Sequence, residues 1–483
     1  MTIAHLAADK KYSHFDLAST NGQGKWEIDF INVTAFLVER GYFIYRTSVE
    51  RWIIIRIVDN IVKQVGKKDL KDELLNYICK IDIGARFMHQ FFLKNIGKAV
   101  SDEFIETLPE KNVEFRKDRP DAIQVYYQNC IVKIQKEKIT THSYSSLNGY
   151  IWESQILDRD YIEDEILPNS DFCRFIFHLA NKEHERANSI CSAFGFYLHN
   201  HKFPGFCPAV ILNDEVISDH PEGGTGKGLF FKAVSKFVKM LKIDGKTFNF
   251  DKNFVYARVT KDTRLVFFDD VKKNFDFERL FSVITEGMVT EKKGKDEEYL
   301  DYHDSPKIGI STNYAIRGSG NSHDRRRFEI EISQHYNKNN NPRKEFGRMM
   351  FDEWPRSEWI QFDNYMIQCC QLYLKNSLIG QKLINLEKKR LTAETNQDFL
   401  EFIKEKDLIK IGLIGKKTLI DEFLADAEDM ATQKWFTKQL FTKWLNAYCK
   451  FNQITLIDRR DTTGSFRCYQ FVSDKVKGNS DKI

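Results

Sequence analysis

The residues best suited to chemistry form a glycine-rich segment with one lysine. It reads Pro221-Glu-Gly-Gly-Thr-Gly-Lys-Gly228 and lies between a short apolar run, 208–212, and a helical stretch from 229 to about 240. Glycines let backbone N–H groups converge on phosphate oxygens, a helix N-terminus adds partial positive charge, and a lysine reaches the β- and γ-phosphates. The segment therefore predicts a nucleotide phosphate site at Gly223, Gly224, Thr225, Gly226, Lys227, Gly228 and Leu229.

This segment departs twice from the pattern G-x-x-x-x-G-K-[ST]. Pro221 stands where the first glycine is expected, and Gly228 replaces the hydroxyl residue that would ligate Mg²⁺. A glycine-rich turn with a surface lysine has the same composition. Taken alone, the segment is only moderately specific.

Two later strand ends carry residues that suit the same chemistry. The apolar run 265–268 ends in Asp269 and Asp270. One carboxylate would hold Mg²⁺, directly or through water, and the other would orient or deprotonate the attacking water. The run 308–313 ends in Asn313, which would hydrogen-bond the γ-phosphate or that water. An ordinary buried strand followed by a polar turn gives either pattern.

A run of three arginines follows, at 325–327, ahead of an alternating stretch. An arginine there is suited to reach a neighbouring subunit's nucleotide and to stabilise charge on the transferring phosphoryl group. Arg325 and Arg326 are the candidates, although the sequence does not separate them from Arg327. A basic turn before an edge strand is the alternative. Four weak signals in this compact order are jointly strong.

The compact order resembles the superfamily 3 helicases, and within them the poxvirus-type primase-helicases of phages, viruses and mobile elements. The strings 222–228, 267–271 and 310–314 are particularly similar to primase-helicase proteins of mobile elements in Bacteroides-like bacteria. Members of that subgroup can carry glycine after the P-loop lysine. The resemblance covers about residues 150–390 and extends loosely to 129–157 and to the C-terminal region.

What the resemblance implies is an AAA+-type ATPase that uses ATP and Mg²⁺. Such proteins assemble as hexameric rings and move along single-stranded DNA, typically 3′ to 5′. They also carry a hairpin that projects into the pore. The matching stretch here, 287–296, has a Lys-Gly-Lys tip suited to backbone phosphates. A solvated charged loop is the alternative. The expected DNA contacts are Lys292, Lys293, Lys295 and His303.

The secondary-structure pattern predicts an α/β protein with several domains. We expect an N-terminal α/β accessory domain (1–160), a helical collar (161–205), a P-loop ATPase core of AAA+ type (206–335), a helical lid (336–395) and a C-terminal winged-helix-like domain (396–483). The charged stretch 387–390 is predicted to be a solvated link to the last domain. No primase catalytic set is visible before residue 171, so a separate primase or replication initiator is an expected partner.

The predicted winged-helix outline consists of helices at 417–425 and 433–451 and a hairpin that pairs 454–458 with 466–472. Its basic residues suit a duplex-binding wing, and docking of a partner protein is nearly as plausible. These residues are Lys416, Lys417, Lys434, Lys438, Arg459, Arg460 and Arg467.

Composition limits the remaining possibilities. The 483 residues include 39 Phe and only 9 Pro, which favours packed domains over linkers, and a net charge of +4 excludes a polybasic protein that coats nucleic acid. Nine cysteines without a C-x-x-C pair lead us to expect neither a disulfide framework nor a zinc site. No apolar run reaches about 18 residues, so we expect no membrane partner and a cytoplasmic location. The resemblance implies that the cell is a bacterial host.

Three functions fit these observations. The first is an ATP-dependent DNA helicase acting on single-stranded and forked DNA in the replication of a phage or mobile element. The second is a ring ATPase that does not unwind DNA, such as a replication initiator, a loader or an anti-phage defence switch. The third is a catalytically weak DNA-binding scaffold, which the departures at Pro221 and Gly228 keep open.

Overall fold

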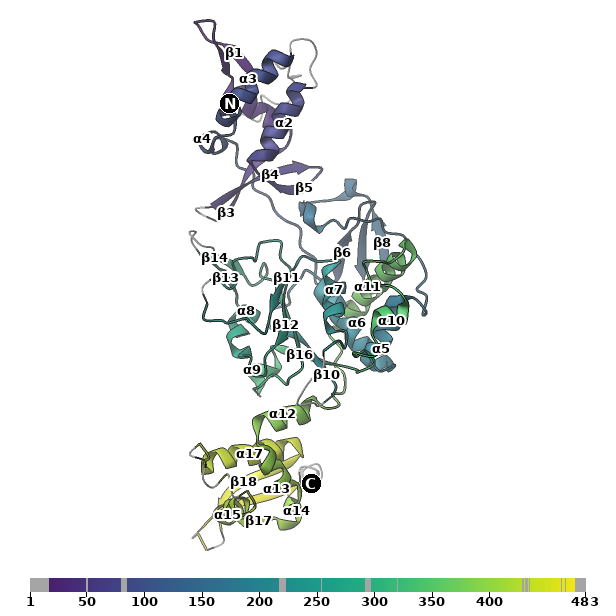
Figure 1. Ribbon diagram of the computed structural model, residues 1–483, viewed down its shortest axis with the longest axis vertical. Helices are drawn as coiled ribbons and strands as arrows, with labels where there is room; N and C mark the ends of the chain where they lie inside the picture. The colour runs from purple at the N-terminus through teal and green to yellow at the C-terminus, as the bar shows by residue number, and fades with distance from the viewer. Residues whose placement is uncertain are drawn as a thin grey trace, which may run out of the picture.

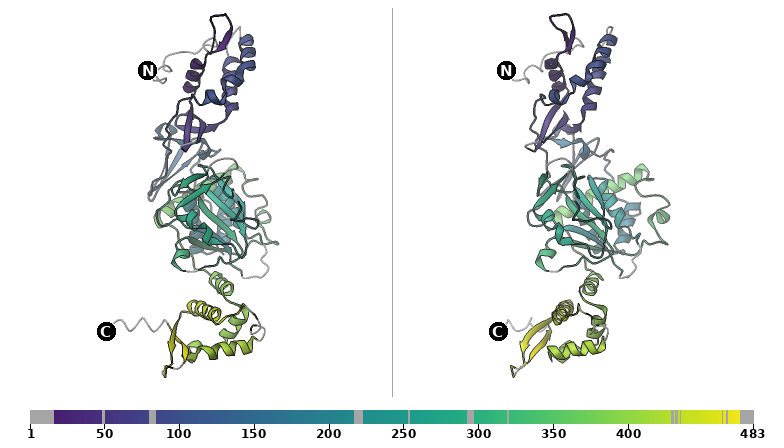
Figure 2. Two further views of the ribbon diagram at one scale, coloured as in Figure 1. Left: turned by 90° about the vertical axis from the view of Figure 1, so that its left-hand side faces the viewer. Right: turned by 60° about the vertical axis from the view of Figure 1, so that its left-hand side comes forward.

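The protein has three lobes along one long axis (Figures 1 and 2). An N-terminal lobe and a C-terminal lobe flank a central α/β lobe, and α12 (Leu386–Glu394) leads from the centre to the C-terminal lobe. In this computed structural model the described residues are 17–48, 51–79, 85–216, 223–252, 254–291, 297–318, 320–427, 430, 433, 435–461, 463–464 and 466–473. None of the helices in these ranges has the length and apolar character needed to cross a membrane.

The N-terminal lobe combines a two-stranded antiparallel sheet and a separate four-stranded sheet with a group of helices. Its strands are β1 (Ala18–Thr20), β2 (Trp26–Ile28), β3 (Tyr42–Ser48), β4 (Arg51–Val58) and β5 (Ile61–Val65), and the short β9 (Ile151–Trp152) adds to β5 in parallel. Its helices are α1 (Phe30–Glu39), α2 (Lys67–Cys79), α3 (Ala85–Ala99) and α4 (Asp102–Ile105). The helix α2 buries Leu70, Leu74 and Ile78 at a spacing of four, which explains why one face packs inward.

A second small sheet packs on the central lobe. It consists of β6 (Ala122–Tyr126), β7 (Ile131–Gln135) and β8 (Ile139–His142). Its buried residues, including Ile123 and Ile134, share one hydrophobic core with the helices of the central lobe. By packing, residues 122–142 therefore group with the centre, although the sequence placed them in the N-terminal domain.

The central lobe is built on a five-stranded sheet in which every neighbouring pair is parallel. The strand order is β11–β12–β15–β10–β16. The strands are β10 (Ala209–Asp214), β11 (Met240–Asp244), β12 (Leu265–Val271), β15 (Lys307–Thr312) and β16 (Arg327–Ile332). All residues of β10 and β15 are buried, as expected for inner strands of a parallel sheet covered on both faces.

Long helices cover one face of this sheet, and short helices with irregular segments cover the other (Figure 1). Val210 and Leu212 point into a core with α5 (Asp171–Leu179), α6 (His184–Leu198), α7 (Lys227–Ser235) and α11 (Arg356–Asn376). Ala209 and Ile211 point to the opposite core, with η4 (Phe277–Leu280) and α8 (Phe281–Thr285). The alternation along one strand thus supplies both cores.

An antiparallel pair, β13 (Gly287–Thr290) and β14 (Glu298–Asp301), connects the sheet strands β12 and β15. The structure thus has a strand pair where the sequence predicted a hairpin. Lys292, Lys293 and Lys295 lie outside the described residues. Two short helices complete the central lobe, α9 (Asn321–Asp324) and α10 (Pro342–Phe346).

The C-terminal lobe pairs helices with a three-stranded antiparallel sheet. Its helices are α13 (Gln397–Lys404), α14 (Leu408–Ile411), α15 (Lys416–Asp426) and α17 (Lys438–Phe451). The strands are β17 (Leu413–Gly415), β18 (Ile454–Arg460) and β19 (Arg467–Ser473), with β19 in the middle. The hairpin of β18 and β19 agrees with the sequence prediction, and Lys434 lies outside the described residues.

Three sequence expectations differ from the structure. The stretch 171–199 forms two helices, because Asn181 and Lys182 adopt left-handed backbone angles that end the first. The helix after the glycine segment ends at Ser235, and Met240 begins β11. The stretch 387–390 lies inside α12, which leads to the C-terminal lobe as predicted, and Glu387 and Lys388 are exposed; Lys389 is buried, which the prediction of a solvated stretch missed because charge composition does not reveal buried partners.

Candidate nucleotide site

The glycine segment connects the end of β10 to the start of α7, as the sequence predicted. Pro221 and Glu222 lie outside the described residues, and the visible segment begins at Gly223. Gly226 caps α7 with φ +102°, and a Cβ there would lie 2.8 Å from the Leu179 side chain of α5. Glycine is required at this position by both backbone conformation and space.

Lys227 is buried among oxygen atoms at the carboxyl edge of the sheet. Its Nζ lies 2.6 Å from Asp214 Oδ1 and donates to Asn313 Oδ1 at 2.7 Å and to Thr225 Oγ1 at 3.2 Å. The Thr225 hydroxyl in turn donates to Asp214 Oδ1 at 2.6 Å. Burial lowers the pKa of Lys227, and the Asp214 carboxylate opposes that shift. All three ammonium hydrogens therefore have an acceptor.

The paired aspartates reach the same place through a local irregularity of β12. The register between β12 and β15 shifts between Phe268 and Val271, and Asp270 has φ +56°. A bulge of this kind re-aims side chains at the end of a strand, and aspartate tolerates the left-handed conformation better than most residues. The backbone N–H of Asp270 donates to Ser311 Oγ at 2.8 Å, which stabilises the turn.

Each aspartate carboxylate has one polar partner and one lysine. Asp269 accepts from the Ser311 hydroxyl at 2.8 Å and pairs with Lys242 at 2.6 Å. Asp270 accepts from Asn313 Nδ2 at 3.2 Å and pairs with Lys246 at 2.6 Å.

The Asn313 amide thus joins the two halves of the site, because it accepts from Lys227 and donates to Asp270. The hydrogen bond that Lys246 donates to Asp270 raises the pKa of this exposed lysine.

A cavity of about 610 Å³ lies beside these groups. Its lining includes every residue that the sequence assigned to phosphate binding, from Gly223 to Leu229, together with Asp269, Asp270, Ser311 and Asn313. The cavity lies at the carboxyl ends of parallel strands, where open α/β sheets bind their ligands.

The donor set fits a magnesium nucleotide. Two carboxylates and a hydroxyl offer the hard oxygen ligands that Mg²⁺ prefers, and the start of α7 offers backbone N–H groups to phosphates. Gly228 lines the cavity without a hydroxyl, so the customary Mg²⁺ ligand is missing from that position. An added Cβ at Gly228 would meet nothing within 4 Å.

The arginines lie at the opposite, amino edge of the sheet. Arg327 pairs in register with Ala209, the first residue of β10, whereas Asp214 at the cavity is the last. At about 3.3 Å per residue the two edges are roughly 17 Å apart. The structure therefore does not bring Arg325 or Arg326 to the nucleotide cavity of their own chain.

Only one of the three arginines is exposed without a side-chain partner among the described residues. Arg327 is buried and pairs with Asp324 at 3.1 Å and with Glu329 at 3.5 Å. Arg326 lies over the Phe281 ring, 4.5 Å from its centroid, and donates to the Ser322 carbonyl. Arg325 is the exposed one.

His303, the remaining predicted DNA contact, is exposed just after β14. Its ring lies 5.1 Å from that of Tyr302 and 6.3 Å from that of His201. It belongs to the amino edge of the sheet, close to the start of β15, and is not part of the nucleotide cavity.

Sequence reasoning missed four groups of the site: Asp214, Ser311, Lys242 and Lys246. The sequence does contain a signal for Asp214, because this residue follows an apolar run as Asp269 follows another. The two lysines had none, since a lysine near a strand end is common and its partner is remote in sequence. Lys389 was also missed; its ammonium donates to the backbone carbonyl of Asp214.

Comparison with known proteins gives three findings. A family of unknown function (DUF5906) matches residues 220–327, less than a quarter of the chain, and this range contains the glycine segment and all three arginines. No curated protein sequence matches. Several solved structures share part of the layout.

The apo structure of the NrS-1 C-terminal region is 16% identical with a TM-score of 0.44, and the match covers 92% of this chain and 100% of that one. An A-form apo structure of the same region gives 15% identity, a TM-score of 0.45, and 91% and 99% coverage. A JCV helicase with a bound small molecule is 14% identical with a TM-score of 0.27, and the match covers 49% of this chain and 64% of that one. Because these identities and TM-scores are low, function has to be inferred from the residues of the site.

Proposed function

We propose that this protein is an ATP-dependent DNA helicase of the superfamily 3 type, with an AAA+-like core. The observation that carries the proposal is the convergence of Lys227, Asn313 and the Asp269–Asp270 pair on one cavity at the carboxyl edge of a parallel sheet. These residues come from the start of α7, the end of β12 and the residue after β15, and their roles in phosphoryl transfer are complementary.

In this mechanism Lys227 and the backbone N–H groups of residues 223–228 bind the phosphates of ATP. Lys227 exchanges at least its bond to Asn313 for a phosphate oxygen, while the buried Asp214 keeps its ammonium in place. Bound Mg²⁺ would neutralise phosphate charge, and Asp269, Asp270 and the Ser311 hydroxyl are the groups that would hold it. One aspartate and Asn313 orient the attacking water.

The position of Arg325 supports a site shared between subunits. Its guanidinium lies at the sheet edge opposite the cavity and is exposed, so it can serve only a nucleotide held by another copy of the chain. We propose a homo-oligomeric ring, hexameric by the resemblance of the motifs. Arg325 then stabilises charge on the γ-phosphate of the neighbour.

DNA contact is assigned to two regions. The antiparallel pair β13–β14 flanks residues 291–297, and we propose that Lys292, Lys293 and Lys295, which lie between the two strands in sequence, would contact the phosphates of a single strand. The C-terminal lobe would act as a winged helix on duplex DNA, since Arg459 and Arg460 lie at the exposed end of β18. Replication of a phage or mobile element in a bacterial cytoplasm, with a separate primase, is the setting proposed.

Gly228 favours a second candidate, a ring ATPase that binds DNA but does not unwind it. Without the hydroxyl that ligates Mg²⁺, hydrolysis would be slow, and slow hydrolysis suits an initiator, a loader or a defence switch.

Strand displacement on a forked DNA duplex with ATP and Mg²⁺ tests the proposal, with ATP hydrolysis recorded in parallel and Lys227→Ala as the comparison. We expect unwinding that is lost in the variant. DNA-stimulated hydrolysis without unwinding would favour the second candidate, and absence of both activities would overturn the ATPase assignment.

A further inference from the structure

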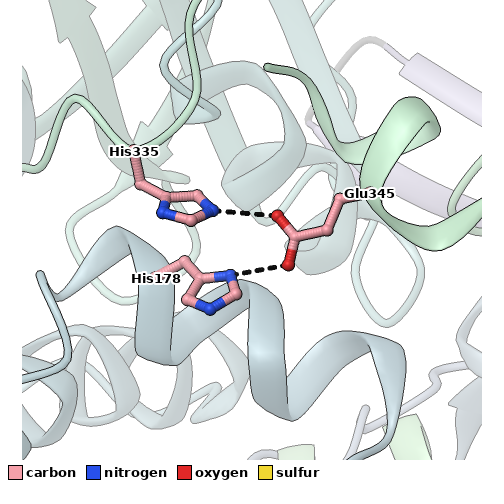
Figure 3. Close-up of side chains that lie close together, drawn as sticks. All are labelled: His178, His335 and Glu345. Atoms are coloured by element: carbon pink, nitrogen blue, oxygen red, sulfur yellow. Dashed lines mark hydrogen bonds and ion pairs between the residues drawn. The ribbon is translucent and has the colours of Figure 1, made fainter.

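Two histidines and a glutamate meet on the far side of the glycine segment, outside the nucleotide cavity (Figure 3). His178 lies near the end of α5, His335 follows β16, and Glu345 belongs to α10. Their donor atoms all lie within 4.8 Å of one another. In the part of the chain that the structure describes, these three residues form the group of His, Cys, Asp or Glu side chains that is close enough to hold a metal ion. The nucleotide mechanism uses none of them.

The two imidazole rings stack and aim one nitrogen each at the same carboxylate. His178 Nδ1 lies 3.0 Å from Glu345 Oε1, and His335 Nε2 lies 2.9 Å from Oε2. The ring centroids are 3.9 Å apart and the planes meet at 21°. All three side chains are largely shielded from water, with side-chain exposures of 13, 28 and 12%.

Few other polar groups surround the two ring nitrogens. His335 Nε2 lies 3.3 Å from the Asn340 amide nitrogen, which itself donates to the His335 carbonyl at 3.1 Å. His178 Nδ1 lies 3.3 Å from the Tyr336 hydroxyl. When the two nitrogens carry no proton, each presents a lone pair on the side where Glu345 presents a carboxylate oxygen.

We propose that His178 Nδ1, His335 Nε2 and the Glu345 carboxylate bind a divalent transition-metal ion of the zinc class. The ion accepts the lone pairs of both nitrogens and of one carboxylate oxygen, while Asn340 keeps its bond to the His335 carbonyl. Two imidazoles and a carboxylate are a ligand set that zinc takes, with a fourth position for water.

The site requires only a small adjustment to hold such an ion. Tetrahedral bonds of about 2.1 Å place donor atoms about 3.4 Å apart, close to the nitrogen–oxygen distances already present. One stacked ring must turn so that both lone pairs point to one centre. Arg174, which donates to Glu345 Oε1 at 3.0 Å, has a side chain 42% exposed and can swing into solvent.

An ion bound here would stabilise the residues that pack against the glycine segment on the side away from the cavity. Leu179, next to His178, and Phe175 both lie against the Cβ position of Gly226. Tyr336, next to His335, stacks on Phe175 with centroids 5.5 Å apart, and Ser333 bonds to the carbonyl of His178. The metal would thus join α5, α10 and the chain after β16 into one wall beneath the phosphate-binding turn.

Metal binding can be tested without any nucleotide, so failure here is distinct from failure of the proposed function. The full chain, free of an affinity tag and stripped with a chelator, is titrated with Co²⁺ while visible d–d absorption is recorded, and Zn²⁺ is then added as a competitor. We expect one Co²⁺ per chain, displaced by Zn²⁺, with no thiolate charge-transfer band.

Glu345→Gln and His335→Gln should each weaken Co²⁺ binding by about 100-fold or more, since each removes a ligand. His142→Asn, which changes an exposed histidine at the end of β8, is the matched control and should bind as the wild type does. Circular dichroism verifies that the variants fold. Absence of Co²⁺ binding, equal binding by Glu345→Gln, or a thiolate band from the buried cysteines would overturn the proposal.

Discussion

The two edges of the central sheet differ in how complete they are within one chain. At the carboxyl edge, Lys227 is joined to Asp214 and Asn313, and Asn313 to Asp270, so the chain assembles this group by itself. At the amino edge, Arg327 is buried and paired with Asp324 and Glu329, and Arg325 is left exposed. The carboxyl edge thus completes its charged cluster within one chain, whereas the amino edge leaves a cation exposed.

The largest effect should come from Lys227→Ala, which removes the cation of the carboxyl edge. We expect ATP hydrolysis to fall to background. Because the Asp214 carboxylate is then buried and unpaired, stability should also fall by about 3–5 kcal/mol, measured by chemical denaturation.

The double variant Lys227→Ala/Asp214→Asn separates these two losses. It removes the unpaired charge, so stability should largely recover while hydrolysis stays absent. Full stability of the single variant would show that Lys227 is not paired in the folded protein.

Arg325→Ala tests whether the amino edge acts on a neighbour. Hydrolysis should fall by about 10³-fold, as for a lost arginine finger, while binding of a fluorescent ATP analogue is kept. Arg326→Ala is the matched comparison and should cost far less, because Arg326 is held over Phe281.

Mixing subunits makes this prediction sharper. A mixture of Arg325→Ala and Lys227→Ala chains contains interfaces with an intact lysine from one chain and an intact arginine from the other. It should regain part of the hydrolysis that each variant lacks. No recovery in mixed oligomers would contradict a shared site.

A smaller effect is expected from restoring the missing hydroxyl with Gly228→Ser. The space for a side chain is open, so the variant should fold without strain. We expect a several-fold gain in hydrolysis at low Mg²⁺, measured as rate against Mg²⁺ concentration. Gly228→Ala adds the Cβ without the hydroxyl and should show no such gain; equal behaviour of the two would mean that Mg²⁺ is held without this position.

The smallest effect on activity should come from Lys389→Met, because Lys389 contacts the carboxyl edge only through the backbone of Asp214. Lys389 donates to the Asp214 carbonyl, and burial lowers the pKa of its ammonium. Loss of this bond should cost about 1–3 kcal/mol and loosen α12, measured by hydrogen exchange, with about a two-fold change in hydrolysis. Lys388→Met, exposed on the same helix, should change neither.

Much of the central lobe could be predicted from local patterns. The apolar runs at 208–212, 265–268 and 308–313 correspond to β10, β12 and β15, and their polar ends meet as expected. Helix ends were less predictable, since the helix after the glycine segment was expected to reach about residue 240 and α7 ends at Ser235. The link at 387–390 was predicted, but its buried contacts within α12 were not, because Glu329, the partner of Arg390, lies far away in sequence.

The sequence by itself determined the order of glycine turn, lysine and acidic strand ends, since each of these is contiguous and its geometry is set by the local backbone. Tertiary structure decided which arginine is exposed, which carboxylate neutralises Lys227, and that His178, His335 and Glu345 meet. These outcomes depend on burial and on partners from distant elements. Packing of α5, α10 and α12 against the sheet fixes those partners, and no local pattern encodes it.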